Sequence, residues 1–394
     1  MKLIFVTDAR FIKDNDGNIY SESSFGYKLW ERYLSEFDEV VVMARVKFES
    51  NPNYSVLHLS SGDKVQFIEL PYFLGIYQLV LKSLSVFKAV NKAIESNIEN
   101  PDVVFLCRVP SVIGTIVAKK LIRKKRNYAV EVVGDPWEVF GENGIQHPLR
   151  KFFRLKSYRD LIEIVKNAYG VLYVTKRALQ ARYPANKTAF QIDVSDVIIT
   201  DEGFPESYKK FNLKEEYTLI SVGSLAQMYK APDIVLKAVK KVRDNGINCR
   251  LVWLGDGIYK ESMIGLANQL EINDCVDFRG NVNESQVKEA LLSSDVFVLA
   301  SRTEGLPRAI VEAMAEGLPC IASNVGGIPE LLPEDVLVPV NNVDALAAMM
   351  EKFFNDSDFY DLKAKQNLEE AKKYKKSVLD AKRLSFFNHL KTFN

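Results

Sequence analysis

The stretch of sequence that decides the fold is Ser301-Arg302-Thr303-Glu304-Gly305-Leu306-Pro307-Arg308-Ala309-Ile310-Val311-Glu312-Ala313-Met314-Ala315. A strand-like apolar run at 296–300 precedes it, and a second apolar run at 319–322 follows it. We therefore predict a buried strand, a loop that turns into a helix, and a second buried strand. Pro307 suits the first helical position, because the N–H that proline lacks has no intrahelical partner there.

The same stretch carries groups that suit a sugar nucleotide. The start of a helix offers free backbone N–H groups and the positive end of the helix dipole, which favour a phosphate. Glu304 lies in the predicted loop, and Glu312 lies more than one turn into the helix. Carboxylates only accept hydrogen bonds, so they suit the hydroxyl donors of sugars. Phosphate donors flanked by two hydroxyl acceptors predict a sugar-nucleotide pocket.

These residues resemble the Glu-x7-Glu signature of retaining glycosyltransferase family 4, whose members have the two-domain GT-B fold. The motifs that carry the resemblance are Glu304-Gly305-Leu306-Pro307, Glu312-Ala313-Met314-Ala315 and Gly326-Gly327-Ile328-Pro329-Glu330. The resemblance covers roughly 215–340 and extends more weakly over the N-terminal half. It implies that a sugar moves from a nucleotide-diphosphate donor to a hydroxyl acceptor with retention.

The composition is that of an ordinary globular protein. The 394 residues are 47% hydrophobic and 26% charged, which fits two or three domains. A net charge of +1 gives no overall field that would favour nucleic acid. The four cysteines and three histidines are scattered, so they form no zinc pattern, and the cysteines are typical of reduced core residues.

Apolar runs give no sign of export or of a membrane span. The first run, within 1–8, is too short for a signal peptide and is predicted to be a buried strand. No apolar run reaches about eighteen residues, so we expect no transmembrane helix. The expected location is the cytoplasm.

Strand and helix patterns alternate along the chain, which predicts an α/β fold with two doubly wound, Rossmann-like domains facing a cleft. Ligands of such sheets bind beyond the carboxyl ends of the strands. We assign 1–205 to an acceptor-binding domain and 206–370 to a nucleotide-sugar-binding domain. The resemblance implies that the helix in 371–394 crosses back to the first domain. The predicted strands are 3–7, 40–44, 65–70, 103–106, 128–133, 171–174, 217–223, 250–255, 276–278 and 296–300.

A glycine turn leading to a lysine at a helix start predicts a diphosphate site at Gly223 and Lys230. Family 4 has Gly-Arg-Leu followed by Lys-Gly in this region. Lys230 matches the family lysine, but Ser224 stands at the arginine position, so one positive charge is missing. The candidates to replace that charge are Arg308, Lys176 and Arg108.

Other turns are predicted to line the donor pocket. Gly255 belongs to a strand-end turn that approaches the nucleotide in family members, although a plain turn is an equal alternative. This turn lacks the third glycine of a dinucleotide fingerprint, so NAD is rejected. Arg279 and Asn281 match the stretch that lines the base pocket, with a strand cap and a turn as the alternative. In the first domain, Gly26 matches the family's glycine-rich loop.

Acceptor-binding residues are predicted after three strands of the first domain. Many family members have a histidine near Gly134, but this chain continues with Asp135, which suits an acceptor hydroxyl or the donor sugar. Trp137 suits stacking on a sugar face; an Asp-Pro turn with a packed tryptophan is the alternative. Arg108 and Lys176 suit a phosphorylated acceptor, or are simply solvated.

Two further segments have a composition that suggests a ligand. The acidic segment 14–18 does not fit a calcium loop, because glycine and glutamate are missing at the required positions, and we predict a hairpin turn. The basic and aromatic segment 148–159, with the apolar segment 72–90, suits helices on an anionic inner membrane and a lipid-linked sugar acceptor. The alternative is two core-packing helices.

The resemblance implies a role for each central residue. Glu312 would bind the ribose hydroxyls, and Glu304 the hydroxyls of the transferred sugar. Lys230, with the N–H groups of Leu306 and Arg308, would stabilise the leaving diphosphate without a metal or another cofactor. The predicted catalytic residues are Glu304, Lys230 and Asp135, and Gly305 is predicted to bind the donor.

Two rival interpretations stay open at this point: a GT-B enzyme of another chemistry, such as an epimerase or a phosphorylase, and a non-catalytic binding partner. A GT-B sugar-nucleotide epimerase would release an isomerised donor without an acceptor. A phosphorylase would need a pyridoxal-bearing lysine and a longer chain. A non-catalytic nucleotide-sugar-binding partner in a glycan-assembly complex would fit the changes at Ser224 and at Gly134-Asp135. The favoured setting is bacterial surface-polysaccharide or glycoconjugate synthesis.

Overall fold

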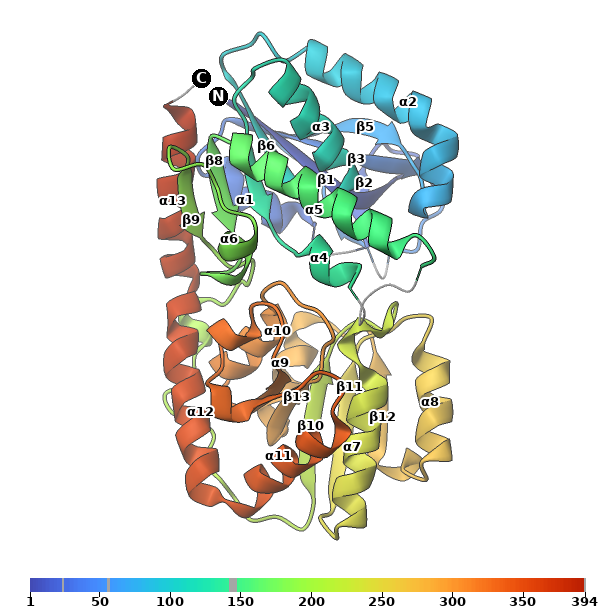
Figure 1. Cartoon of the computed structure of the whole chain (residues 1–394), viewed down its shortest axis with the longest axis vertical. Helices are drawn as coiled ribbons and strands as arrows, with labels where there is room; N and C mark the ends of the chain where they lie inside the picture. Colours follow the sequence, from blue (N-terminus) through green and yellow to red (C-terminus); the bar gives the residue numbers. More distant parts are fainter. Residues whose placement is uncertain (23–24, 55–56, 142–146, 393–394) are drawn as a thin grey trace.

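The structure, a computed structural model, describes residues 1–22, 25–54, 57–141 and 147–392. Its described residues form two lobes, one above the other in Figure 1, each built on a sheet with helices against it. The first sheet has nine strands and the second has six. The predicted α/β fold with two Rossmann-like domains is confirmed.

The first sheet is parallel except for one short antiparallel edge. β1 lies between β3 and β6, both parallel to it, and β2 and β4 add the antiparallel edge. The strands are β1 (Lys2–Lys13), β2 (Ile19–Ser21), β3 (Glu39–Phe48), β4 (His58–Leu59), β5 (Val65–Pro71), β6 (Val103–Val109), β7 (Ala129–Val132), β8 (Gly170–Tyr173) and β9 (Phe190–Asp193). The helices are α1 (Tyr27–Leu34), α2 (Gly75–Glu95), α3 (Val112–Arg123), α4 (Pro136–Val139), α5 (Arg150–Asn167) and α6 (Ala178–Arg182).

Side chains of β1 explain why this sheet is covered on both faces. Leu3 and Phe5 belong to one core cluster, and Ile4 and Val6 belong to another. Because side chains alternate along a strand, the two clusters lie on opposite faces of the sheet. A strand buried on both faces reads as the continuous apolar run seen in the sequence.

The hairpin predicted at 14–18 is confirmed, because it joins β1 to the antiparallel β2. The Asp14 carboxylate accepts hydrogen bonds from the N–H groups of Asp16 and Asn18, at 3.0 and 2.8 Å. The carboxylate that suggested a cation ligand thus closes a turn. β1 also runs further than predicted, because it resumes its pairing with β3 after a register shift between Val6 and Arg10.

The second sheet is entirely parallel, in the order β12-β11-β10-β13-β14-β15. Its strands are β10 (Tyr217–Val222), β11 (Cys249–Leu254), β12 (Val276–Gly280), β13 (Val296–Leu299), β14 (Cys320–Ser323) and β15 (Leu337–Val338). Its helices are α7 (Pro232–Asp244), α8 (Lys260–Gln269), α9 (Glu284–Ser293), α10 (Arg308–Ala315), α11 (Val343–Asn355) and α12 (Ser357–Ala371). Short 3-10 turns are η2 (Asp201–Gly203), η3 (Met228–Lys230), η4 (Asn273–Cys275), η5 (Ile328–Glu330), η6 (Glu334–Val336) and η7 (Lys372–Tyr374).

The strand order of this second sheet reverses at β10. The chain first proceeds outward to β11 and β12, and then returns to place β13 on the other side of β10. Ligands of doubly wound sheets bind at such a switch point, beyond the carboxyl ends of the two strands. The loops that follow β10 and β13 are therefore where a site is expected.

The last helix, α13 (Lys376–Lys391), leaves the second lobe and packs against the first (Figure 1). Phe387 contacts the rings of Tyr33 and Phe37, with centroids 5.4 and 5.7 Å apart. Gly170 in β8 lies directly under α13, since a Cβ there would come within 2.7 Å of Leu390. The chain thus starts and ends in the same lobe.

We predict that Gly170→Val destabilises the protein by about 1–3 kcal/mol, because the added methyl groups would overpack the contact with α13. The measurement is the midpoint of urea unfolding. Gly265→Ala is the control: a Cβ at this helical position meets nothing within 4 Å, so the change should gain up to about 1 kcal/mol. An unchanged midpoint for Gly170→Val would mean that α13 does not pack there.

Candidate active site

The site is built on the two loops of the switch point. The loop after β10 ends in η3, where Lys230 is buried, and the loop after β13 carries Glu304. The Lys230 ammonium donates to the Glu304 carboxylate at 2.6 Å, and the two side chains are 10% and 9% exposed. The Ser301 hydroxyl donates to the same Glu304 oxygen at 2.6 Å. Two of the predicted catalytic residues, Lys230 and Glu304, are thus paired with each other.

The charge state of Lys230 follows from this pairing. Burial alone would lower the pKa of the ammonium, but the Glu304 carboxylate and Tyr229 raise the pKa above its usual value. The lysine therefore stays positively charged at every physiological pH. A buried, permanently charged ammonium is a suitable partner for an anionic ligand.

Arg302 holds this lysine turn against the Glu304 loop, a role that the sequence analysis missed. Its guanidinium donates to the Met228 carbonyl at 2.6 Å and to the Asp233 carboxylate at 2.7 Å. Its backbone N–H donates to the Tyr229 carbonyl at 2.7 Å. The arginine at the start of the key stretch thereby fixes the position of Lys230.

Close packing of backbone explains the glycines of the site. Gly255, at φ +137°, lies so close to the loop after β10 that a Cβ would overlap the Gly223 carbonyl. Gly223 in turn lies under the Lys230 side chain, whose Cγ would be 3.0 Å from an added Cβ. Both predicted donor glycines therefore shape the loops and bring Lys230 into place.

Glu312 stands apart from the paired charges. On α10, it makes no hydrogen bond or ion pair within the described ranges 1–22, 25–54, 57–141 and 147–392. Burial raises the pKa of its carboxyl above the usual 4.5, and Arg308 counteracts the rise only in part. A half-buried acid without a partner is an acceptor that a ligand hydroxyl can use.

The helix that carries Glu312 begins one residue later than predicted. Pro307 is the N-cap residue, in an extended conformation, and α10 starts at Arg308. The predicted first-turn position of Pro307 is therefore wrong by one residue. The N–H groups of Leu306 and Arg308 still lie at the helix start, where no intrahelical acceptor exists.

The Glu304 loop is also where the two lobes touch. A Cβ at Gly305 would come within 2.7 Å of the Val133 carbonyl in the first lobe. Gly327 donates its N–H to the Gly305 carbonyl at 2.7 Å. The glycine pair after β14 therefore supports the loop from behind, while Gly134 faces it from the other lobe.

Glu330 links the lobes more directly, a role that no pattern in the sequence indicates. Its carboxylate accepts hydrogen bonds from the N–H groups at the start of α6, at 3.0 Å from Arg177 and 2.6 Å from Ala178, and also from Lys176. A carboxylate at a helix start is stabilised by the helix dipole. The Thr175 hydroxyl accepts from the next N–H, that of Leu179, at 3.0 Å, so a local and a distant side chain cap this helix together.

The predicted acceptor residues are largely engaged within the first lobe. Asp135 caps α4, accepts from the Tyr183 hydroxyl at 2.6 Å and pairs with Arg182. Trp137 lies under the Arg154 guanidinium, 3.9 Å from the ring centre. Both residues follow the alternative, an Asp-Pro turn with a packed tryptophan, and this arrangement does not favour the catalytic role predicted for Asp135.

Arg108 and Lys176 are also held by carboxylates. Arg108 pairs with Glu131 at 2.9 Å and with Asp196. Burial would raise the pKa of Asp196, but Arg108 lowers it to about 2. Lys176 donates to Glu370 at 3.1 Å. An acceptor phosphate would have to compete with these partners.

The remaining predicted residues lie at the rim or elsewhere. Ser224 is exposed. Its hydroxyl donates to the Asp256 carbonyl and accepts from the Ala226 N–H. Arg279 is exposed and pairs with Asp277 at 2.8 Å, and Asn281 is exposed beside it. Gly26 precedes α1 in the first lobe. In the described part of the chain, no group of three or more His, Cys, Asp or Glu residues is arranged to hold a metal ion.

Comparisons with known proteins identify relatives of the chain. Residues 204–375 match the family described as glycosyl transferases group 1. The chain is similar to protein CapJ of Staphylococcus aureus, at 32% identity over 89% of this chain and 86% of CapJ. It is also similar to the amylovoran biosynthesis glycosyltransferase AmsK of Erwinia amylovora, at 31% identity over 36% of this chain and 38% of AmsK.

Solved structures show the same fold. Sucrose-phosphate synthase from Thermosynechococcus elongatus superimposes with a TM-score of 0.71 at 15% identity, covering 100% of both chains. HepE of Anabaena, in complex with UDP and glucose, superimposes with a TM-score of 0.67 at 14% identity, covering 98% of both. At these identities the likeness concerns the fold alone.

We predict that Glu312→Gln raises the melting temperature at pH 8. Because burial raises the carboxyl pKa, ionising Glu312 costs more in the folded than in the unfolded state, so the wild type loses stability as the pH rises through 4.5 and beyond. At pH 4 both states are protonated and the difference should vanish. The measurement is thermal unfolding against pH. The exposed Glu289→Gln is the control, and a lower melting temperature for Glu312→Gln at pH 8 would contradict the account.

Proposed function

The chain belongs to the group 1 glycosyltransferases, and from this premise we propose that it transfers a sugar from a nucleotide-diphosphate donor to a hydroxyl acceptor with retention. The observation that carries the proposal is the combination of a buried ammonium and a carboxylate on two adjoining loops with the start of α10 and a second carboxylate on that helix. The epimerase, phosphorylase and non-catalytic alternatives have no comparable support in the relatives.

The unpartnered Glu312 is the proposed acceptor for the donor's ribose hydroxyls. Hydrogen bonds from these hydroxyls would offset the cost of ionising a buried carboxyl. Glu304 would accept from hydroxyls of the transferred sugar through the carboxylate oxygen that Lys230 and Ser301 leave free. In this proposal the ion-paired Glu304 binds the transferred sugar and the unpaired Glu312 binds the ribose.

Lys230 and the start of α10 are proposed to stabilise the leaving diphosphate. The proposed donors are the N–H of Arg308, the first residue of α10, and that of Leu306 in the loop before it, and Lys230 supplies a full charge without a metal. Family 4 has an arginine at the position of Ser224, and we propose that Arg308 supplies the missing positive charge. Its charge acts on both Lys230 and Glu312, whereas Arg108 and Lys176 already have carboxylate partners.

The proposed reaction needs no base from the protein. As the bond between the sugar and the diphosphate breaks, an acceptor hydroxyl attacks from the same face, and a diphosphate oxygen takes its proton. The sugar carbon then keeps its configuration, and the products are a glycoside and a nucleoside diphosphate. Preorganised positive charge at the diphosphate lowers the barrier because charge develops there.

The proposed setting is the synthesis of a bacterial surface polysaccharide or related glycoconjugate. AmsK, which is similar over part of its length, is described as an amylovoran biosynthesis enzyme. A sugar or a lipid-linked sugar is the proposed acceptor. No helix within the described residues is long and apolar enough to cross a bilayer. The proposed contact with a lipid-linked acceptor is peripheral, at the cytoplasmic face of the membrane.

The outer face of α2 supports this contact. Its inner face packs into the core through Val86 and Val90, yet its outer face also exposes large apolar side chains along one stripe. These are Tyr77 (77% exposed), Val80 (65%), Leu81 (68%) and Leu84 (86%). α2 lies along the outer edge of the first lobe (Figure 1). An exposed apolar stripe on a helix is expected to be covered in the cell.

A second helix of the same lobe adds positive charge. Around the start of α5, the apolar residues Leu149 and Phe152 are exposed beside Arg150 and Lys151. Apolar side chains that insert between headgroups, with lysine and arginine that attract anionic lipid, are the combination of a peripheral membrane surface. The original alternative, two core-packing helices, leaves these exposed apolar residues unexplained.

We predict that Glu304→Gln and Lys230→Met each lower kcat for transfer by 10²–10³-fold, roughly the loss of one preorganised electrostatic group. Each single change also leaves the other charge buried and alone, which destabilises the fold. The double variant Lys230→Met/Glu304→Gln is therefore the control: it should regain a normal melting temperature while staying inactive. Product formation from a panel of nucleotide sugars is the readout. Near-wild-type turnover in both single variants would refute the site.

We also predict that Leu81→Glu/Leu84→Glu lowers the fraction bound to anionic phosphatidylglycerol vesicles at least about tenfold, because two charged side chains replace inserted apolar ones. The measurement is vesicle co-sedimentation. Leu213→Glu/Ile258→Glu, at two exposed apolar sites outside α2 and α5, is the matched control and should bind like the wild type. Equal recovery of the wild type with and without anionic lipid would remove the membrane proposal.

A further inference from the structure

Two arginines lie side by side on neighbouring strands of the first lobe, and neither is paired with an acid. The parallel register of β1 and β3 places Arg10 next to Arg45, and neighbouring strands are about 4.8 Å apart. Burial lowers the pKa of Arg45, and the charge of Arg10 lowers it further. Among the described residues, Arg10 makes no hydrogen bond or ion pair, and Arg45 makes no ion pair. Two like charges this close favour an anion between them.

Neutral groups fix the position of Arg45. Its guanidinium lies over the Phe73 ring, 4.4 Å from the ring centre, and donates to the carbonyls of Phe73, at 2.9 Å, and of Asp8. The Nε–H is buried without a partner, so any donors left for a ligand are on the two terminal nitrogens. Carbonyl acceptors leave the full positive charge uncompensated, and a fixed guanidinium suits a phosphate.

Two acids near the arginines do not neutralise them. The Asp8 carboxylate raises the pKa of Arg45, but it is held at the start of α3, where it accepts from the N–H groups of Val112 and Ile113 at 2.7 and 2.8 Å. Glu22 directly follows the end of β2. Within the described part of the chain, Glu22 makes no ion pair with either arginine.

Lys82 of α2 adds a third positive charge at the same place. Its ammonium donates to the Tyr72 carbonyl at 2.6 Å, one residue before the phenylalanine that Arg45 contacts. Lys82 is exposed, and it too has no acidic partner in the described ranges. Three basic side chains that share one short segment and lack carboxylate partners select an anionic ligand.

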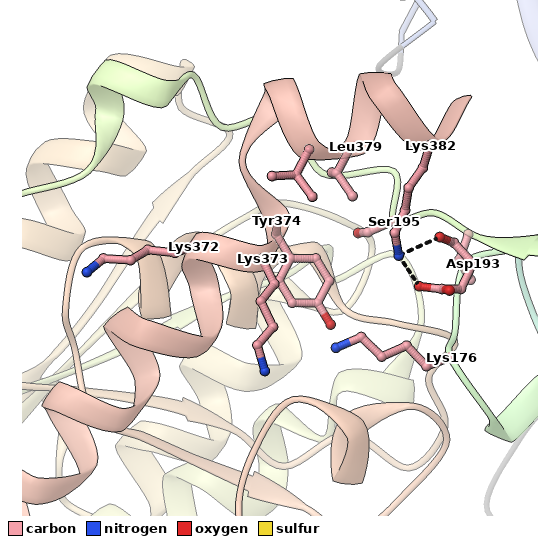
Figure 2. A pocket seen from close by; sticks show the side chains of 10 residues that line it. Lys176, Asp193, Ser195, Lys372, Lys373, Tyr374, Leu379 and Lys382 are labelled. Carbon is pink, nitrogen blue, oxygen red and sulfur yellow. Dashed lines mark hydrogen bonds and ion pairs between the residues drawn. The ribbon is translucent and has the colours of Figure 1, made fainter. Parts of the chain in front are cut away.

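The basic side chains first predicted to bind a phosphorylated acceptor differ from these three. Arg108 is paired with two acids. Lys176 lines a cavity of about 480 Å³ where the chain crosses back to the first lobe (Figure 2), and it pairs with Glu370 at 3.1 Å. In the same cavity Lys382 donates to Asp193 at 2.7 Å. Their positive charges are already compensated, so a phosphate gains less there.

The two arginines lie toward the edge of the first sheet that faces the second lobe. The Val133 carbonyl, just beyond the end of β7, lies against Gly305 of the donor loop. β1, β3, β6 and β7 are parallel, so their carboxyl ends share one edge, where ligands of such sheets bind. Arg10 and Arg45 belong to the second halves of β1 and β3. They are therefore on the side of the lobe from which an acceptor meets the donor.

The same cluster adjoins the exposed apolar stripe of α2. This helix follows the carboxyl end of β5, which is parallel to β3, so its start lies at the same edge. Leu74, directly before α2, and Tyr77, in its first turn, are exposed, and the stripe continues from them along the helix. Positive side chains at one end of an apolar stripe match a ligand that has a phosphate and a hydrocarbon chain.

We propose that Arg10, Arg45 and Lys82 form the phosphate subsite for the acceptor, which is a sugar joined to a lipid chain through a phosphate or diphosphate. This inference rests on the proposed function, and it narrows the acceptor to one chemical class. The lipid chain lies along the α2 stripe, the phosphate lies at the three basic side chains, and the sugar extends toward the Glu304 loop.

The test measures binding to the full chain by isothermal calorimetry, with no nucleotide sugar present. The probe is octyl phosphate, which joins a phosphate to one alkyl chain and carries nearly two negative charges at neutral pH. Octyl glucoside has the same chain and no charge. Octyl phosphate should bind about tenfold more tightly, or better. Equal binding of octyl glucoside, or no binding at about 5 mM octyl phosphate, would overturn the proposal.

The variant Arg10→Gln/Lys82→Gln removes two exposed charges and leaves the contacts of Arg45 in place. Its melting temperature should stay near that of the wild type, while its affinity for octyl phosphate falls on the order of tenfold. The matched control Lys88→Gln/Arg123→Gln, at two exposed sites, should bind like the wild type. The donor-site variant Lys230→Met/Glu304→Gln should also bind normally. Undiminished binding by the first variant, or loss in the donor-site variant, would refute the subsite.

Dihexanoyl phosphatidylglycerol, a soluble phospholipid, separates the acceptor from an ordinary membrane lipid. Its diester has one negative charge, against about two on octyl phosphate, so it should bind about tenfold more weakly. If it binds equally well and also loses affinity in Arg10→Gln/Lys82→Gln, these residues bind headgroups and the acceptor assignment is wrong. Because transfer is not measured, failure here leaves the proposed function standing. A chain that binds octyl phosphate through these residues but transfers no sugar would contradict the proposed function alone.

Discussion

The buried ion pair between Lys230 and Glu304 is the interaction on which the rest of the site depends. Moving either charge out of water alone costs several kcal/mol, roughly, and only a close partner offsets this cost. The pair therefore fixes the loop after β10 against the loop after β13 before any ligand arrives. Arg302 and Ser301 complete this arrangement by binding the turn and the carboxylate. The protein presents a formed charge pair, so a donor meets groups that are already in position.

The two acids of the signature differ in a way that spacing alone does not reveal. Glu304 is satisfied by an ammonium and a hydroxyl, whereas Glu312 is half-buried without a partner. The Glu312 carboxylate can accept hydrogen bonds that no group among the described residues donates. If the ligand's hydroxyls donate these hydrogen bonds, the unpaired carboxylate lowers the stability of the free protein but raises its affinity for the ligand.

Much of the fold was predictable because its signals are local. Buried parallel strands appear in the sequence as short apolar runs. The Gly-Leu-Pro turn predicts the start of α10, although Pro307 is the N-cap of that helix and not its first residue. The partners of Asp135 and Glu330 were not predictable. Asp135 bonds Tyr183, and Glu330 caps α6 more than a hundred residues away in sequence. Such pairings depend on how elements dock, and no spacing rule encodes them. The predicted donor residues Lys230 and Glu304 come together at one switch point, whereas the predicted acceptor residues Asp135, Arg108 and Lys176 are bonded to partners within the protein.

The return of α13 to the first lobe has a consequence for how the chain is made. The second lobe is one continuous segment, from β10 to α12, and every piece of its core is available as soon as that segment has emerged. The first lobe lacks the helix that covers Gly170 and Phe37 until α13 has been synthesised. Since domains generally fold as units during translation, the lobe that is begun first is the one completed last. Until then, its uncovered apolar surface is open to chaperones on the ribosome.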